Sequence, residues 1–182
     1  AAHTLEVERA SIWVFSDDGS AIKCLDLYER SRDRHSDGLE LKAAEFPSYF
    51  RAVEDNRTLA AEQAKTDPRT TEFDAAYLTP LGITSMLDAP VRRGGKLIGI
   101  ICHEHIGPPR AWSLEDQAFA GSLADFVSMT LQAADRTEAL RVLRANERQL
   151  RHIMDLVPHM ILAKDSQGRI LLANRAAAQA FG

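Results

Sequence analysis

The stretch from Ser85 to Gln117 constrains the fold of this chain more than any other. Two apolar, β-branched runs, residues 85–93 and 96–105, are separated only by Gly94 and Gly95. Glycine accepts the positive φ angles that a two-residue hairpin loop requires. A Pro-containing loop follows, and then Ser113 with Asp116 three residues later, the spacing of a helix capping box. The sequence therefore predicts a β-hairpin that leads into a capped helix.

Composition excludes several classes of protein. Of 182 residues 45% are hydrophobic, enough for a real core, and the formal net charge of −4 with scattered basic residues argues against a nucleic-acid binder. No apolar run reaches the roughly 18 residues of a membrane span, and the first residues do not form a signal peptide. Two cysteines are too few for a disulfide scaffold. We expect a cytoplasmic protein with no membrane contact in this region.

The N-terminal third predicts a hairpin flanked by less regular segments. Residues 1–9 resemble the end of a helix, residues 11–16 and 21–28 are strands, and Asp17–Ser20 is a turn. Simple alternation in the second strand places Ile22 and Cys24 on one face and Leu25 and Leu27 on the other. The charged residues 29–38 are expected to form a mobile loop.

The middle of the chain predicts short helices. Phe46-Pro47 interrupts a helical pattern, so a helix should cover residues 48–54, and residues 58–64 favour a short strand. Asp67 followed by Pro68 is a good helix start, with Phe73, Tyr77 and Leu78 on one face. Pro80 and Gly82 should end that helix.

Residues 113–157 contain no proline and one glycine, Gly121, and predict one long helix. In its second half an apolar seam recurs every seven residues, which favours a coiled-coil homodimer through residues 136–157. The alternative is a single amphipathic helix that lies on its own domain. The seam consists of Leu143, Leu150 and Val157, complemented by Ala139, Asn146 and Ile153.

The C-terminal residues predict the start of a second domain. Pro158 ends the helix, residues 160–164 and 169–173 form a hairpin, and Asn174 caps a short Ala-rich helix. About 30 residues cannot close a stable core alone, so this domain is incomplete.

The order of these elements resembles a GAF domain over residues 1–133. GAF domains are α+β (α/β) ligand-sensing domains, in which a central antiparallel sheet is flanked by helices and short helices form a roof over a pocket. The type resembled occurs in bacterial signalling proteins beside histidine kinase or diguanylate cyclase modules. The residues that carry the resemblance are 10–15, Asp67-Pro68-Arg69-Thr70, Glu72-Phe73, 77–83, 85–91, 99–105 and Trp112.

The tail resembles the opening of a PAS domain. Residues 153–161, Lys164-Asp165, Gly168-Arg169 and 173–176 carry this resemblance. Together the two resemblances imply a sensory domain over 1–133, a helical coiled-coil linker over 134–157, and the start of a PAS-like domain, a partial β-hairpin, over 158–182.

Several kinds of chemistry are weighed against an ordinary core. His103 and His105 share a strand face and could ligate zinc, but no third ligand is visible, so no metal is expected. Cys102 lies in a predicted strand, whereas bilin-binding GAF domains carry their cysteine beside a roof helix, so no bilin is expected. Glu72-Phe73-Asp74 only superficially resembles a cyclic-nucleotide signature. His152 lacks the acidic neighbour of a phosphoacceptor histidine.

A small-molecule pocket should lie on one face of the sheet. Aromatic and Met walls with a few polar groups suit such a site, and Asp88 needs a partner such as Arg92, His103 or a ligand amine. The candidates are Phe50, Phe73, Tyr77, Met86, Asp88, His103 and His105.

The predicted function is a sensor that itself has no catalytic residues and passes ligand or partner binding to a dimeric helix. Two alternatives remain: a dimerisation scaffold that binds nothing, and a GAF-type methionine sulfoxide reductase using Cys24 and Cys102.

Overall fold

The computed structural model describes residues 1–181. Contacts divide the chain into a first unit, Ala1–Gln132, and a second unit that begins at Ala133. Within the described residues, no helix is both long and apolar enough to cross a membrane.

The first unit is built on a seven-stranded antiparallel sheet with the order β3-β2-β1-β7-β6-β5, and β4 also pairs with β2. Its α+β architecture agrees with the expected fold class. The strands are β1 (Arg9–Phe15), β2 (Ala21–Glu29), β3 (Arg34–Ser36), β4 (Glu40–Lys42), β5 (Leu59–Ala61), β6 (Ile83–Arg93) and β7 (Lys96–Ile106).

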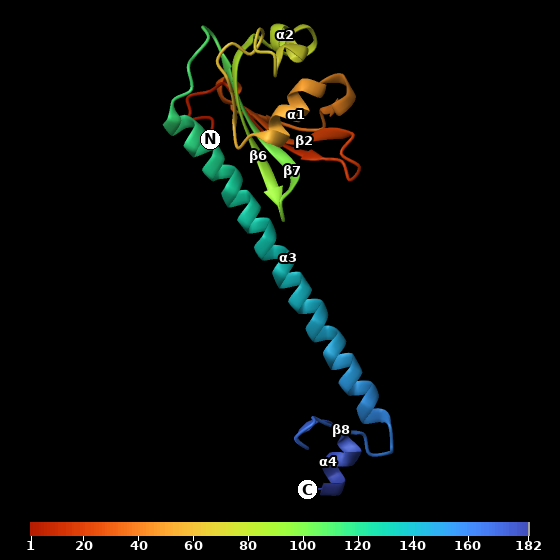
Figure 1. Ribbon diagram of the computed structural model, residues 1–182. Coiled ribbons are helices and arrows are strands. Elements are labelled where there is room, and N and C mark those ends of the chain that lie inside the picture. Colours follow the sequence, from red (N-terminus) through yellow and green to blue (C-terminus); the bar gives the residue numbers. More distant parts are fainter. Residues whose placement is uncertain (182) are drawn as a thin grey trace. The chain divides into compact units, whose positions relative to one another are not determined.

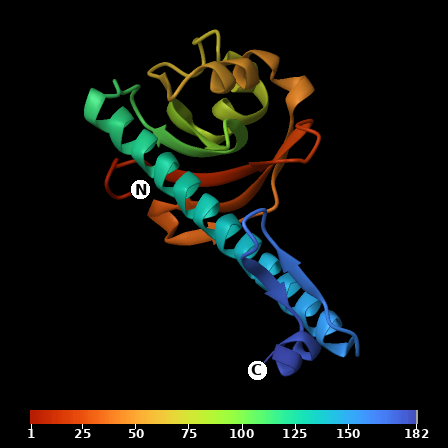
Figure 2. The ribbon, with the colours of Figure 1, turned by 60° about the horizontal axis from the view of Figure 1, so that its bottom comes forward.

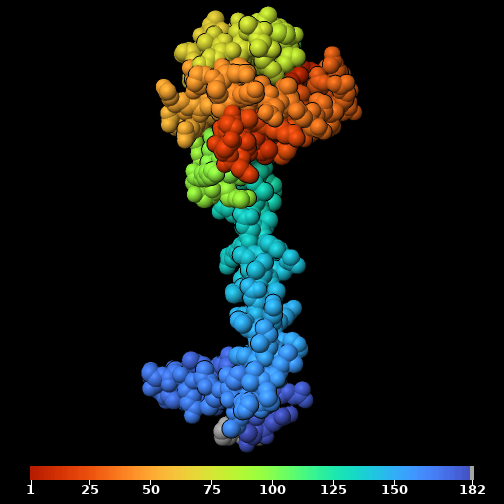
Figure 3. All heavy atoms as spheres, turned by 90° about the vertical axis from the view of Figure 1, so that its right-hand side faces the viewer, coloured from red at the N-terminus to blue at the C-terminus, as the bar shows by residue number. Residues whose placement is uncertain are grey.

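Helical elements cover both faces of this sheet (Figures 1 and 2). Short helices form a roof on one face, and the first half of α3 lies with the N-terminal residues on the other. In Figure 3 the orange to yellow-green atoms of the roof segments form a continuous layer. The helices are η1 (Arg30–Arg32), η2 (Ala43–Glu45), α1 (Pro47–Asp55), η3 (Thr71–Phe73), η4 (Asp74–Leu78, a π-helix), α2 (Thr79–Leu81) and α3 (Leu114–Leu156).

Two hydrophobic cores result, one on each face of the sheet. The roof-side core packs aromatic side chains such as Tyr49 and Phe73 on Trp13 and Ile100. The core on the α3 side consists of smaller side chains, listed here: Ala2, Leu5, Val7, Leu87, Ala89, Val91, Ile101, Trp112, Ala120 and Ala124. Neighbouring strand residues serve opposite cores because successive side chains alternate between faces.

The hairpin and the helix start are confirmed. Gly94 and Gly95 take φ angles of 59° and 82°, and Arg93 pairs with Lys96 across the turn. The amide of Asp116 donates to Ser113 Oγ, and the amide of Ser113 donates to Asp116 Oδ2, both at 3.0 Å. These reciprocal bonds are a complete capping box.

The prediction of a helix over residues 1–9 is wrong. This segment makes a single turn, closed by bonds from the amide of Leu5 to Ala1 O and from Val7 to Ala2 O, and Arg9 already belongs to β1. Leu5 and Val7 are buried in the α3-side core. Their burial favours the turn over a continued helix.

A β-bulge overturns the expected alternation in β2. Ile12 pairs with Asp26 but Trp13 pairs with Cys24, so Leu25 is the extra residue and is 53% exposed. The bulge returns Leu27 to the face of Cys24, in the roof-side core. Residues 29–38 are also more ordered than expected, since they contain η1 and the paired strand β3.

Asp67 caps a turn and not a helix. Its Oδ1 accepts bonds from the amide and the Nε of Arg69, both at 2.9 Å, and Arg69 also donates to Ala60 O at 2.7 Å. The first helical residue is Thr71. Gly82, in the left-handed region at φ 70°, ends the helical segment, whereas Pro80 lies within α2.

Arg92 at the end of β6 connects the roof to α3. Its guanidinium donates to the carbonyls of Val53 at 3.1 Å and Glu54 at 2.7 Å, near the end of α1. The hydroxyl of Ser128, on α3, donates to the carbonyl of Arg92. A single residue thus bonds to helices on both faces of the sheet.

The second unit contains the rest of α3 and the predicted hairpin and helix. The hairpin pairs β8 (Leu162–Lys164) with β9 (Ile170–Ala173), and α4 (Arg175–Phe181) follows. Asn174 caps α4, because its Oδ1 accepts from the amide of Ala177 at 3.1 Å. Ile170 and Leu171 are 61% and 69% exposed.

Candidate functional site

The space between roof and sheet is filled by an aromatic cluster. Phe46 stacks on Phe73 with ring centroids 4.1 Å apart, and Tyr49 meets Phe73 edge to face at 4.8 Å. Beside Met86 and Cys102 these side chains leave a cavity of about 10 Å³. Such a volume holds at most about one water molecule. A ligand could enter here only if the roof moved.

Asp88 is a fully buried acid in this cluster. The hydroxyl of Tyr49, on α1, donates to Asp88 Oδ2 at 2.7 Å. The other oxygen, Oδ1, has no hydrogen-bond partner among the described residues. Burial raises the pKa of Asp88 to about 7, although the bond from Tyr49 opposes this shift. The side chain of Cys102 and the amide of His103 also lie close enough to this carboxyl to oppose the rise in its pKa.

A buried ion pair lies at one end of the cluster. Arg9 Nε donates to Glu104 Oε2 at 2.7 Å, and a second guanidinium nitrogen donates to the hydroxyl of Tyr77 at 3.3 Å. Arg9 and Glu104 are only 5% and 2% exposed. The pair ties the start of β1 to the end of β7 and to the π-helix η4, which belongs to the roof.

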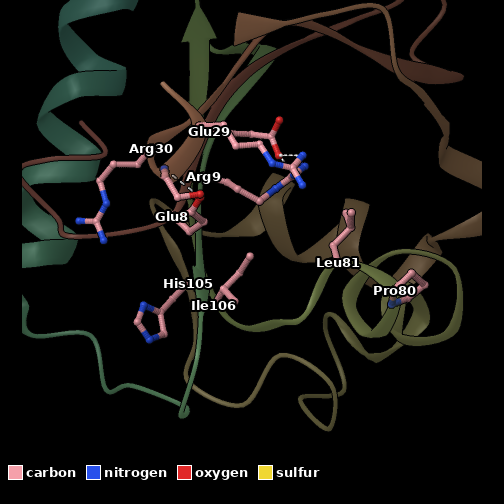
Figure 4. A pocket seen from close by; sticks show the side chains of 10 residues that line it. Glu8, Arg9, Glu29, Arg30, Pro80, Leu81, His105 and Ile106 are labelled. Atoms are coloured by element: carbon pink, nitrogen blue, oxygen red, sulfur yellow. Dashed lines mark hydrogen bonds and ion pairs between the residues drawn. The ribbon is translucent and has the colours of Figure 1, made fainter. Parts of the chain in front are cut away.

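A surface cavity of about 430 Å³ borders this ion pair. Figure 4 shows Arg9 and Glu29 joined by an ion pair on one side of it. Arg30 and Arg32 add further cations, and Glu8 adds a carboxylate that accepts bonds from Ser31 of the adjoining loop. This volume lies within the range of small-molecule sites.

The model of the GAF domain family matches residues 1–131. The chain belongs to the GAF domain family. After the GAF domain, a PAS domain model matches residues 148–182. No functionally curated protein matches this sequence.

Solved GAF domains share this fold. The blue-light-absorbing form of the PixJ GAF domain from Thermosynechococcus elongatus is 18% identical, with a TM-score of 0.63 over 83% of this chain and 86% of that one. A domain of a putative two-component sensor histidine kinase from Sinorhizobium meliloti is 18% identical, with a TM-score of 0.56 over 77% of this chain and 89% of that one. The GAF domain of a two-component sensor histidine kinase from Bacillus halodurans is 20% identical, with a TM-score of 0.55 over 72% of this chain and 86% of that one. At these identities the likeness establishes the fold.

The GAF domain brings four of the predicted site residues together. Phe73, Tyr77 and Met86 line the small interior cavity. Asp88 adjoins it through Tyr49, a partner that the sequence reasoning missed. Phe50 packs on the edge of the same core, edge to face with Tyr49 at 5.5 Å, and lines a second surface cavity of about 340 Å³ near the hairpin turn.

His103 and His105 do not share that face. In β7 Cys102 and Glu104 point into the roof-side cluster, so the alternating histidines point elsewhere. His103 Nδ1 donates to Leu87 O at 2.8 Å, and its buried Nε2 has no partner among the described residues. Burial lowers the pKa of His103 to about 4. His105 lines the surface cavity, and burial lowers its pKa too.

The two cysteines are poorly suited to redox catalysis. Both are buried, and burial raises the pKa of Cys24 and places that of Cys102 well above its usual range. The thiolate is the reactive form of cysteine, so raised pKa values oppose reductase chemistry. In the described part of the chain no three His, Cys, Asp or Glu side chains form a group that could hold a metal.

Sequence reasoning also missed Arg9 and Glu104 as members of the site. The register offered a signal, since Arg9 and Glu104 are direct partners across β1 and β7. Opposite charges on directly paired residues attract one another. That register becomes visible only once the strand order is known.

Proposed function

We propose that this chain is the sensory and regulatory part of a cytoplasmic signal-transduction protein. The GAF domain would bind a small ligand or a partner, and a dimeric helix over residues 136–157 would transmit the bound state. The parent would be a histidine kinase or a diguanylate cyclase. The domain boundaries predicted above, at 133/134 and 157/158, belong to the same proposal.

The observation that carries the proposal is Asp88. A buried polar atom without a partner costs roughly 1–3 kcal/mol, so a core selected only for stability would exclude it. Its Oδ2 is bound to Tyr49 on the roof helix α1, and a ligand with a hydrogen-bond donor could satisfy Oδ1. Entry would displace Tyr49 and with it α1.

Exposed apolar side chains support a partner for the helix. Leu143, Leu150 and Ile153 are 54%, 62% and 51% exposed, and they lie in the predicted heptad seam. Single exposed leucines are ordinary, but a seam at this spacing is typical of paired helices. Asn146 in the seam would fix the register at some cost in stability.

The second candidate function is a scaffold that dimerises without a ligand. The filled interior favours it, since only about 10 Å³ remains between roof and sheet. In this reading Asp88 and Tyr49 are an internal hydrogen-bonded pair and nothing enters.

Native mass spectrometry of freshly purified protein separates the two functions. A small molecule retained by the wild type and lost from Asp88→Asn supports the sensor. A bare dimer for both proteins supports the scaffold.

The dimer is tested independently of the ligand. Leu143→Ser with Leu150→Ser should shift the protein to monomer in sedimentation equilibrium, because both seam leucines are removed. The matched control, Arg144→Ser with Arg151→Ser, has the same spacing outside the seam and should leave the dimer intact. A monomeric wild type would contradict the proposal.

Transmission is tested by disulfide crosslinking. Single cysteines placed along residues 139–157 should crosslink at different rates with and without the retained molecule, because the helix pair would shift in rotation or register. Identical rates in both states would rule out this route.

A further inference from the structure

We infer that the surface cavity at the ends of β1, β2 and β7 is a binding site for a small organic anion. Its ligand would carry a carboxylate or phosphate group on an apolar body. The site lies outside the roof-side cluster that contains Asp88, so the inference does not rest on a ligand beneath the roof.

The charges around the cavity are unequally matched. One carboxylate, that of Glu29, is shared by the guanidinium groups of Arg9 at 3.6 Å, Arg32 at 3.3 Å and Arg34 at 3.5 Å. All three distances exceed the roughly 2.7–2.9 Å of a tight charge-assisted hydrogen bond. Among the described residues no carboxylate pairs with Arg30, the fourth cation of this region. The site therefore has capacity for a further anion.

The remaining carboxylates are already engaged by other groups. Glu8 accepts bonds from the amide of Ser31 at 3.1 Å and from its hydroxyl. Glu104 is held by Arg9 at 2.7 Å on the interior side. The lining of the cavity therefore holds three guanidinium groups against two carboxylates, and an incoming carboxylate or phosphate would balance them.

An apolar wall completes the site. Pro80 and Leu81 of α2 lie on one side of the cavity and Ile106 at the end of β7 on another (Figure 4). Leu81 and Ile106 are 38% and 40% exposed. A ligand with an apolar body would cover this surface, and its affinity would rise with the apolar area removed from water. Inorganic phosphate could not use it.

The inner wall of the site contacts the roof. Arg9 donates to the hydroxyl of Tyr77 on η4, a 3.3 Å contact that is long enough to be rearranged easily. A ligand that binds Arg9 from the cavity would compete for the same guanidinium. Ligand binding in the cavity would then weaken the bond from Arg9 to Tyr77 on the π-helix η4, without any molecule entering the interior.

The test is a titration of the full chain with phenyl phosphate at low ionic strength, monitored by calorimetry. Benzoate tests the carboxylate form, inorganic phosphate the role of the apolar body, and benzyl alcohol the role of the charge. We expect saturable binding of phenyl phosphate or benzoate, at least tenfold weaker binding of inorganic phosphate, and none of benzyl alcohol.

Two arginine substitutions, one in the site and one outside it, provide the test and its control. Arg30→Gln should weaken the binding of phenyl phosphate at least fivefold, whereas Arg51→Gln, an exposed arginine on α1, should leave it unchanged. Leu81→Ser should weaken phenyl phosphate more than inorganic phosphate. Amide chemical-shift changes should centre on Ser31, Leu81 and Ile106.

Three results would overturn the inference. They are the absence of saturable binding for both organic anions, equal losses in Arg30→Gln and Arg51→Gln, and equal affinity for phenyl phosphate and inorganic phosphate. None of them bears on the molecule sought beneath the roof by native mass spectrometry, so the two proposals fail separately.

Discussion

The two faces of the sheet are buried in opposite ways. On the α3 side small residues, Ala120, Gly121 and Ala124, let a helix approach closely over an aliphatic surface. On the roof side large aromatic rings enclose ionisable groups, among them Asp88 and Glu104. Each face buries one ionisable group with an unpartnered atom, Asp88 on the roof side and His103 on the α3 side, but the buried ion pair of Arg9 and Glu104 lies on the roof side. The buried polar network is thus larger on the roof side, where the candidate site lies.

The largest expected effect is the loss of the buried ion pair on the roof side. Arg9→Met leaves the carboxylate of Glu104 buried without its guanidinium and should cost about 3–5 kcal/mol in unfolding free energy. Adding Glu104→Leu should recover much of that loss. Urea unfolding followed by the fluorescence of Trp13 and Trp112, both in the first unit, measures it.

The control is Arg32→Met, whose side chain is 66% exposed and whose pairing with Glu29 is at the surface. It should change stability little. If Arg9→Met is no more destabilising than this control, the polar roof-side network contributes nothing to folding.

Asp88 should give the roof side a stability that falls as pH rises. Its pKa is about 7 in the folded protein and roughly 3.9 in an unfolded chain, so the folded state retains a proton that the unfolded state releases. The contribution of Asp88 to the free energy of unfolding is fully present below the unfolded-state pKa. It is lost as pH rises to about 7, and the loss is on the order of 4 kcal/mol. The stability of Asp88→Asn relative to the wild type should therefore increase as pH rises from roughly 3.9 to about 7. A difference in unfolding free energy that is constant with pH would contradict it.

His103 should give the α3 side the opposite dependence. Its folded pKa of about 4 lies below the roughly 6.5 of an unfolded chain, so its contribution is lost as pH falls. The expected loss between these values is on the order of 3 kcal/mol. His103→Gln keeps a donor for Leu87 O and should lose less stability in acid than the wild type. Thermal unfolding of both proteins across the window checks the sign, and equal acid losses would refute it.

The smallest effect concerns the close approach of α3. Ala124 is 3% exposed, and Ala124→Leu should cost about 1–3 kcal/mol by overpacking the contact with the sheet. Ala134→Leu makes the same change at an exposed position outside the seam and should be nearly neutral. Urea midpoints of the two variants decide the matter. Equal midpoints would mean that this side is loosely packed.

Local chemistry made much of the fold predictable. Gly94-Gly95 and the pair Ser113 and Asp116 act through neighbouring backbone atoms, so their turn and cap follow from sequence. The bulge at Leu25 did not follow, because it depends on pairing with β1. Asp67-Pro68 does not start a helix because both the amide and the guanidinium of Arg69 compete for the Asp67 carboxylate.

The candidate site was less predictable than the fold. Phe73 and Tyr77 follow from residue type and helical spacing, and Met86 and Asp88 from residue type and strand position. The partner of Asp88, Tyr49, lies 39 residues away on α1, and no short-range pattern joins them. The alternation of side chains along β7 was predicted correctly, but it does not say whether His103 or Cys102 faces the roof. That choice depends on which helices pack on each face of the sheet.

Arg92 has a consequence for any force that acts on the domain. Its guanidinium holds two carbonyls near the end of α1, while its own carbonyl holds the hydroxyl of Ser128 on α3. Lifting α1 must therefore either break two charged hydrogen bonds or pull the end of β6 along with it. In the second case the movement of β6 would pull on the hydrogen bond from the Ser128 hydroxyl on α3. The force needed to displace α1 would then depend on Arg92 and Ser128, two residues outside the candidate ligand sites.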